Sequence, residues 1–239
     1  MPVPSRVPVG SVTTDAGRAA TTGVVAGTPA WILHGFASSP ASTKATYFTE
    51  RLRSVGYRVS CPDLNAPDFQ TLTLSRMLGQ LTDALAEAPA PAVLVGSSLG
   101  GALALLAAAA MPERVSRLVL LAPAVMFGHP EHRLFEEIDA ATWQRVGTHP
   151  FMHYGDGRER LLNWAFCEDA PRHHIWDLPC THPALVFQGR QDTVVLPEDV
   201  TAFAAARPAI TLRLLDDGHQ LTAHLPQIWE EMSHFLGCA

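Results

Sequence analysis

The chain has 239 residues, of which 47% are hydrophobic and 17% are charged, which is enough to bury one large core. Its formal net charge of −6 argues against nucleic acid or an anionic membrane surface as the main partner. Four scattered cysteines without a C-x-x-C pair give neither a disulfide framework nor a zinc-site pattern.

Short apolar runs alternate with segments of helical periodicity along the chain. Residues 7–13 and 23–25 give the weakest signals and are expected to form edge strands or an N-terminal arm. Strands are then expected over residues 30–33, 57–61, 92–95, 115–121, 184–187 and 210–215, and helices over residues 43–55, 72–88, 102–110, 198–207 and 225–236. This alternation predicts an α/β fold with a mostly parallel, doubly wound sheet that helices cover on both faces.

Residues 126–183 interrupt this alternation and separate two of the expected core strands. The segment holds three of the five tryptophans and seven of the eleven histidines, with short helical patterns over residues 134–141 and 158–166. A segment of this length without structure is uncommon in a compact domain. We therefore expect an α/β core of residues 1–125 and 184–239 and an inserted helical cap of residues 126–183.

Residues 96–101, with the sequence GSSLGG, form the most informative motif. They follow an apolar strand and open an Ala/Leu-rich helix, and G-x-S-x-G in that context is typical of a nucleophile elbow with Ser98 at its apex. The flanking glycines permit the tight turn, and the helix start favours developing negative charge. The alternative is an ordinary Gly-Ser turn that begins a buried helix.

A serine nucleophile needs a base and an acid that orients the base. After a nucleophile elbow the acid comes first in the chain and the histidine base follows it. Asp192 follows the expected strand over residues 184–187, and His219 follows the strand over residues 210–215. Alternatively, Asp192 caps a helix and His219 is an ordinary loop histidine. Asp216 and Asp217 are weaker choices for the acid, since they lie on the turn that carries the histidine.

Acyl transfer also needs donors for an oxyanion. We expect the backbone N–H of Leu99, directly after the nucleophile, and the N–H of Phe36, in the turn after the first strand. Gly35 allows close approach of the backbone. The side chain of His34 is expected to be structural and to hold this loop by hydrogen bonds.

The chain resembles the α/β-hydrolase superfamily along most of its length. Residues 34–45, HGFASSPASTKA, together with the GSSLGG motif, resemble the YqiA-type esterase branch over about the first half. This resemblance implies a compact serine esterase with the triad Ser98, Asp192 and His219. The chain departs from compact members of that branch by the insertion of residues 126–183 between the sixth and seventh strands of the family fold.

Histidines in the insertion raise a metal hypothesis, carried by His129, His132, His149, His153, His173, His174 and His182. Two histidine pairs, His129 with His132 and His149 with His153, have spacings that could suit zinc ligands on a helix, but a proline interrupts each pair. Neither an H-E-x-x-H motif nor a cysteine accompanies them, so roles as polar surface or pocket residues are favoured over metal binding. The aromatic residues of the insertion are expected mainly in its own core, with a few facing Ser98. Lys44 is the only lysine beside 16 arginines, which we attribute to genomic base composition.

The sequence predicts a serine hydrolase that cleaves small-molecule carboxylic esters and needs no cofactor or metal. The alternatives are a thioesterase or C–C bond hydrolase with the same triad, or a non-catalytic small-molecule binding protein on the same fold. No signal peptide or bilayer-spanning run is apparent, so a cytoplasmic protein without a membrane or nucleic-acid partner is expected. The sequence gives no oligomeric state.

Overall fold

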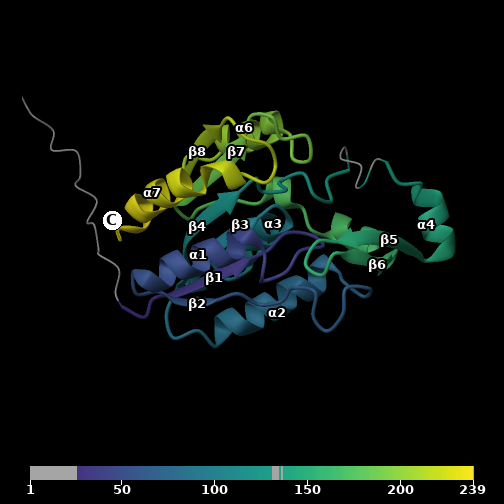
Figure 1. Ribbon diagram of the computed structural model, residues 1–239, viewed down its shortest axis with the longest axis horizontal. Helices are drawn as coiled ribbons and strands as arrows, with labels where there is room; N and C mark the ends of the chain where they lie inside the picture. Colours follow the sequence, from purple (N-terminus) through teal and green to yellow (C-terminus); the bar gives the residue numbers. More distant parts are fainter. Residues whose placement is uncertain (1–25, 131–134, 136, 239) are drawn as a thin grey trace, which may run out of the picture.

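The computed structural model describes residues 26–130, 135 and 137–238, so the strands expected over residues 7–13 and 23–25 lie outside it. A six-stranded sheet forms the centre, in the order β2-β1-β3-β4-β7-β8, and every pairing in it is parallel (Figure 1). Its strands are β1 (Pro29–Leu33), β2 (Arg58–Ser60), β3 (Ala92–Ser97), β4 (Val115–Leu121), β7 (Ala184–Gly189) and β8 (Ile210–Leu215). The predicted α/β fold is confirmed.

The strand order reverses between β1 and β3. The chain runs from β1 outward to β2 at the edge and then returns to place β3 on the other side of β1. Loops leaving the carboxyl ends of β1 and β3 therefore diverge, and open α/β sheets place their ligand sites at such a point. Both the loop with Phe36 and the turn with Ser98 leave the sheet there.

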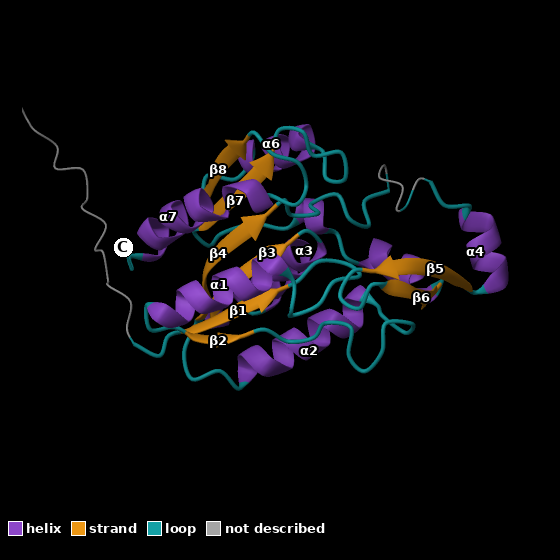
Figure 2. Ribbon diagram, in the orientation of Figure 1, coloured by secondary structure: helices purple, strands orange, loops and turns teal. Residues whose placement is uncertain are grey.

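Helices cover both faces of the sheet (Figure 2). On one face lie α1 (Thr43–Ser54) and α7 (Leu225–Leu236), and on the other lie α2 (Leu74–Ala86), α3 (Leu99–Ala110) and α6 (Pro197–Ala205). The α2 helix buries Leu74, Met77, Leu81 and Leu85, one apolar stripe at helical spacing. The α3 helix is apolar on all sides and is buried almost throughout, which fixes the turn that precedes it.

The insertion contains helices, as expected of a helical cap, but it also contains a pair of strands that were not expected. Its elements are α4 (Ala140–Val146), β5 (Thr148–His153), β6 (Arg158–Asn163) and α5 (Ala165–Asp169), and β5 pairs with β6 as an antiparallel hairpin. Four single-turn helices complete the described chain: η1 (Pro112–Arg114), η2 (Ala170–Arg172), η3 (Ile175–Asp177) and η4 (Thr222–His224).

Two expected helices of the insertion are misplaced, each for a local reason. The helix expected over residues 158–166 is β6 up to Asn163, because Gly157 turns the chain with φ of 68° and cross-strand pairing overrides helical spacing. The helix expected over residues 134–141 lies partly outside the described residues, and α4 begins only at Ala140. Asp139 sets that start, since its carboxylate accepts a hydrogen bond from Thr142 N.

The insertion lies beyond the carboxyl ends of the strands, on the right of Figure 1. Trp143, Leu162, Phe166 and Ile175 are all buried in the same apolar cluster as α2 and α3. Trp143 Nε1 also donates a hydrogen bond of 3.0 Å to Leu162 O. The inserted segment is thus continuous with the main core.

Candidate active site

Ser98 lies on a strained turn between β3 and α3. Its φ of 53° and ψ of −117° are values that residues other than glycine rarely adopt. Ser98 N donates to Leu121 O of β4, and Ser98 O accepts from Gly101 N, both at 2.9 Å. The surrounding structure therefore holds the serine in this conformation at the carboxyl end of a central strand.

Glycines around Ser98 are required by close backbone packing. A Cβ at Gly96 would lie 2.3 Å from Gly100 O, and a Cβ at Gly100 would lie 2.1 Å from Leu33 O. Carbon atoms cannot approach backbone oxygens so closely. The turn therefore brings α3 against β1 in a way that only glycine permits.

Substituting Gly100 with alanine is expected to destabilise the fold by about 3 kcal/mol, because backbone on both sides must shift. For a protein of this size the midpoint of thermal unfolding would fall by roughly 6–12 °C. Gly79→Ala is the matched control, since Gly79 lies in α2 with nothing within 4 Å of an added Cβ. That control should keep or slightly raise the midpoint. Equal effects of the two substitutions would contradict the packing argument.

Asp192 and His219 come together from different loops. Asp192 follows β7 and His219 follows β8, which are neighbours in the sheet. His219 Nδ1 lies 2.9 Å from Asp192 Oδ2, within hydrogen-bond distance. The structure thus brings together the two residues that the sequence singled out as acid and base, 27 positions apart.

The Asp192 carboxylate is buried and fully hydrogen-bonded. Oδ1 accepts from Val194 N and Val195 N at 2.9 Å, and Oδ2 accepts from Gln188 Nε2 at 3.0 Å besides His219. Burial alone would raise the pKa of Asp192, but the bonds from His219 and the two backbone N–H groups outweigh it and lower the pKa. The side chain is therefore an anion held in one orientation against His219.

The two weaker choices for the acid have other partners. Asp217 accepts from His224 Nδ1 at 3.0 Å, from Ala223 N and from Gly218 N. Asp216 is exposed and pairs with Arg190 at 3.2 Å. Asp217 thus holds the turn that carries His219 by hydrogen bonds.

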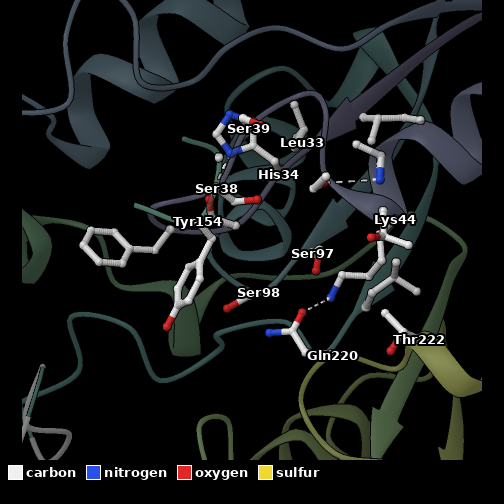
Figure 3. Close-up of a pocket in the computed structure, with 18 of the residues that line it drawn as sticks. Leu33, His34, Ser38, Ser39, Lys44, Ser97, Ser98, Tyr154, Gln220 and Thr222 are labelled. Carbon is white, nitrogen blue, oxygen red and sulfur yellow. Dashed lines mark hydrogen bonds between the residues drawn. The ribbon is translucent and has the colours of Figure 1, made fainter. Parts of the chain in front are cut away.

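Ser98 and His219 line one cavity of about 530 Å³, called here the Ser98 cavity (Figure 3). The described part of the chain contains no hydrogen bond between Ser98 Oγ and His219 Nε2. Such contacts are often long in unliganded sites and shorten when substrate binds. The arrangement thus offers a serine hydroxyl and a half-buried imidazole on the wall of the same cavity.

The two expected oxyanion donors belong to the elbow and to the loop after β1. Leu99 is the first residue of α3, where a helix cannot satisfy its own N–H. Phe36 lines the Ser98 cavity, and Gly35 beside it lies so close that an added Cβ would be 3.4 Å from Ser98 Cβ. The loop after β1 and the elbow thus adjoin, whereas the direction of each N–H toward a bound oxygen stays a prediction.

His34 has the structural role that we expected. The ring is buried, its Nε2 accepts a hydrogen bond of 3.0 Å from Leu64 N, and its Nδ1 lies 2.9 Å from Gly35 O. Burial lowers the pKa of His34, which favours the neutral ring that this pattern requires. The histidine thereby holds the loop that carries Phe36.

A family model matches most of the chain. The uncharacterised protein family UPF0227 matches residues 31–236, which include the elbow and both Asp192 and His219. The chain belongs to the UPF0227 family. This match extends the resemblance to YqiA-type proteins from the first half through both halves of the sequence. No curated protein gives a significant match.

Solved structures that resemble this UPF0227 protein share the α/β-hydrolase fold. Est1E from Butyrivibrio proteoclasticus, bound to ferulic acid, has a TM-score of 0.76 at 22% identity over 88% of each chain. Mouse alpha/beta hydrolase domain-containing protein 10 has a TM-score of 0.72 at 22% identity, over 87% of this chain and 89% of that one. A monoacylglycerol lipase from Paleococcus ferrophilus has a TM-score of 0.71 at 13% identity, over 89% and 96%.

Several residues at the site of this UPF0227 protein were missed in the sequence. Gln188, buried at the end of β7, binds Asp192; Lys44, Gln220 and Tyr154 line the Ser98 cavity. Two signals were available in the sequence: Gln188 is a polar residue near the end of an apolar strand, and Lys44 is the single lysine of the chain. Tyr154 carried no such signal, because only the hairpin brings it to the cavity.

Metal-ligating side chains do not cluster in the described part of this UPF0227 protein. No group of three or more His, Cys, Asp or Glu residues there is placed to hold a metal ion. His132 of the metal hypothesis lies outside the described residues. All four cysteines are free thiols, and no described helix has the length and apolar character needed to cross a bilayer.

Proposed function

We propose that this protein is a serine hydrolase that cleaves carboxylic esters through an acyl-enzyme. The observation that carries the proposal is the bond of 2.9 Å between the buried Asp192 and His219, beside a strained serine on the same cavity. A carboxylate that fixes an imidazole near a serine hydroxyl is the arrangement that activates this nucleophile. A fold neighbour named as a monoacylglycerol lipase supports the same class of reaction.

Acylation begins when Ser98 Oγ attacks the ester carbonyl carbon. His219 Nε2 takes the hydroxyl proton, and Asp192 stabilises the imidazolium that forms. The tetrahedral oxyanion receives hydrogen bonds from Leu99 N and Phe36 N, and the positive end of α3 adds to this stabilisation. His219 then gives the proton to the departing alcohol, and the acyl group remains on Ser98.

Water releases the acid in the second half of the reaction. His219 takes a proton from a water molecule, whose oxygen attacks the acyl carbonyl, and the same histidine then returns the proton to Ser98 Oγ. All proton transfers use one side chain, so the cycle needs no cofactor. Only the neutral ring of His219 can act as the base in these steps.

Steady turnover of p-nitrophenyl butyrate and labelling by a fluorophosphonate test the proposal directly. Both are expected, and the label should be found on Ser98 by peptide mass spectrometry. A protein that binds the ester without releasing p-nitrophenol would be a binding protein on this fold. Faster turnover of a butyryl thioester than of the oxygen ester would move the assignment to a thioesterase.

We also propose that residues 126–183 act as a cap that sets substrate choice. The tip of the β5–β6 hairpin reaches the Ser98 cavity, where Tyr154 lines the wall and donates from its backbone N to Ala37 O at 2.7 Å. Phe36 packs against Phe135, Phe151 and Phe166 of the insertion at 5.2–5.4 Å between ring centroids. The insertion thus contacts the loop beside Ser98 as well as the cavity itself.

Shortening the tip of this cap is expected to change the preference among acyl chain lengths. Complete removal of residues 126–183 would expose core, so Tyr154→Ala is the sharper variant: it removes an exposed ring from the cavity wall. The ratio of kcat/KM for p-nitrophenyl octanoate to kcat/KM for p-nitrophenyl acetate should shift by about five- to tenfold, because the variant loses the apolar contact area of one aromatic ring. Labelling of Ser98 by a small fluorophosphonate should change far less.

Met152→Ala is the control for Tyr154→Ala. Met152 is also exposed on the hairpin, but it does not line the Ser98 cavity. An unchanged chain-length profile in Tyr154→Ala, or the same change in both variants, would mean that the insertion only packs against the core. Substrate choice would then be sought in the loop over residues 36–44.

A further inference from the structure

Lys44 is the single lysine of the chain and lies on the wall of the Ser98 cavity. It is the second residue of α1, whose first turn faces the cavity, and Figure 3 shows its side chain reaching toward Gln220 and the Ser97–Ser98 segment. A chain with 16 arginines thus carries its only lysine beside the candidate nucleophile. Base composition explains the scarcity of lysine and does not explain this position.

The ammonium group of Lys44 has a weak partner. Nζ donates to Gln220 Oε1 at 3.5 Å, the outer limit of a hydrogen bond, and no carboxylate of the described chain lies within ion-pair distance. Asp192 and Asp217 are the acidic groups whose charge influences it, and both are bound to histidines and backbone N–H groups. Burial lowers the pKa of Lys44 to about 8, and these two carboxylates oppose the shift.

The cavity that Lys44 lines also carries several hydroxyl side chains. The lining contains no aspartate, glutamate or arginine among the described residues, and its hydroxyl side chains are Ser38, Ser39, Ser42, Thr43, Ser97, Ser98, Tyr154 and Thr222. Hydroxyl groups can donate to an anion without adding charge of their own. One partly desolvated cation with hydroxyl neighbours is the composition of a site for an anionic group.

We propose that Lys44 is a specificity-determining residue that binds an anionic group, a carboxylate or a phosphate, carried by the ester that Ser98 attacks. The proposal rests on the proposed function and adds the class of substrate to it. An anion at Lys44 would supply the charge partner that Gln220 does not, and α1 would add the partial positive charge of its first turn.

Paired esters test this directly, with acid release followed by titration at constant pH. The acyl-side pair is monomethyl adipate and methyl hexanoate; the alcohol-side pair is 2-(butyryloxy)ethyl phosphate and 2-hydroxyethyl butyrate. In at least one pair the charged ester should have the larger kcat/KM, by about tenfold or more, as expected for a hydrogen bond to a charged group. The two pairs distinguish a carboxylate on the acid from a phosphate on the alcohol.

Lys44→Met should remove this preference, so that the ratio of kcat/KM for the charged ester to kcat/KM for the neutral ester falls to about one or below. Lys44→Arg should keep most of it, since the charge is retained. Arg58→Met is the matched control for loss of one positive charge. Arg58 is exposed at the amino end of β2, whereas Ser98 lies at the carboxyl ends of the parallel strands. A preference that is absent in the native protein, or that survives in Lys44→Met, overturns the proposal.

The ratio of the two kcat/KM values should also depend on pH. Lys44 is charged below a pH of about 8, so the preference should be present there and be lost as the pH rises above that value. Both esters of a pair use the same catalytic residues, so effects common to the two cancel in the ratio. Asp192 and Asp217 stay ionised because their pKa values are lowered. In Lys44→Arg the preference should persist to pH 10.

Binding measurements separate this inference from the proposed function. Should the native protein hydrolyse neither methyl hexanoate nor p-nitrophenyl butyrate, the hydrolase proposal fails. Calorimetry with the intact esters then decides about Lys44: tighter binding of monomethyl adipate than of methyl hexanoate, lost in Lys44→Met, supports the anion site. Equal binding of the two esters by the native protein refutes it.

Discussion

Ser98→Ala is expected to lower turnover of p-nitrophenyl butyrate by about four orders of magnitude or more, the usual cost of losing a triad nucleophile. The reason is that Ser98 alone carries the hydroxyl held at the apex of the elbow by its strained backbone and by bonds to β4 and α3. The variant should fold, since the side chain is only partly buried and makes no capping bond. Release of p-nitrophenol and fluorophosphonate labelling measure the loss, and circular dichroism checks the fold.

Ser97→Ala is the control that distinguishes the elbow serine from its neighbour. Ser97 ends β3 and also lines the Ser98 cavity, but it has ordinary strand backbone and precedes the turn. Its replacement should leave kcat within about tenfold of the native value, in the range of a lost hydrogen bond. A folded Ser98→Ala protein with near-native activity, beside an inactive Ser97→Ala protein, would transfer the nucleophile to Ser97.

The central sheet could be predicted from the sequence because its signals are local. Strands β3, β4 and β7 are short apolar runs bounded by glycine or proline, and α2 and α7 show apolar stripes at helical spacing. Parallel strands buried on both faces must be apolar throughout, so their pattern persists whatever the rest of the chain does. The elbow was predictable for the same reason, since its glycines are imposed by the contacts of one turn.

The insertion could not be predicted in the same way, because its elements depend on partners distant in the sequence. The strand β6 has a spacing that also suits a helix, and only pairing with β5 decides between the two. The ring of Phe36 likewise packs on Phe69 and on aromatic residues of the insertion. Such contacts leave no periodic trace in the sequence.

The polar residues of the site also fall into two groups, those that the sequence could predict and those that it could not. Asp192 and His219 could be found because chain order and strand ends restrict where acid and base can lie. Gln188 and Lys44 obey no such rule. Gln188 is recognisable only when its amide is seen to bridge Asp192 Oδ2 and Val195 O, and Lys44 only when α1 is seen to begin at the cavity.

Asp192→Asn is expected to lower kcat/KM for p-nitrophenyl butyrate by about three to four orders of magnitude, with little effect on KM. The carboxylate accepts from His219 Nδ1 and from two backbone N–H groups, so it holds the ring in the tautomer whose Nε2 is free to take the proton of Ser98. An asparagine of the same size cannot hold a negative charge beside the imidazolium. Its NH₂ group, if it faced His219, would also favour the wrong tautomer.

Asp217→Asn provides the matched comparison, because the carboxylate of Asp217 is also bound to a histidine, His224, and lies two residues before His219 in the sequence. It accepts from His224 and from two backbone N–H groups of the turn that carries His219, so its loss should disturb that turn and lower activity by about tenfold or less. Steady-state kinetics on both folded variants, with the pH profile of kcat/KM, measure the difference. A harmless Asp192→Asn beside a crippling Asp217→Asn would move the acid to Asp217. A carboxylate that stabilises a catalytic imidazolium cannot be neutralised without loss of rate. A harmless Asp192→Asn would therefore mean that the hydrogen bond between Asp192 and His219 only holds the loop after β7 in place.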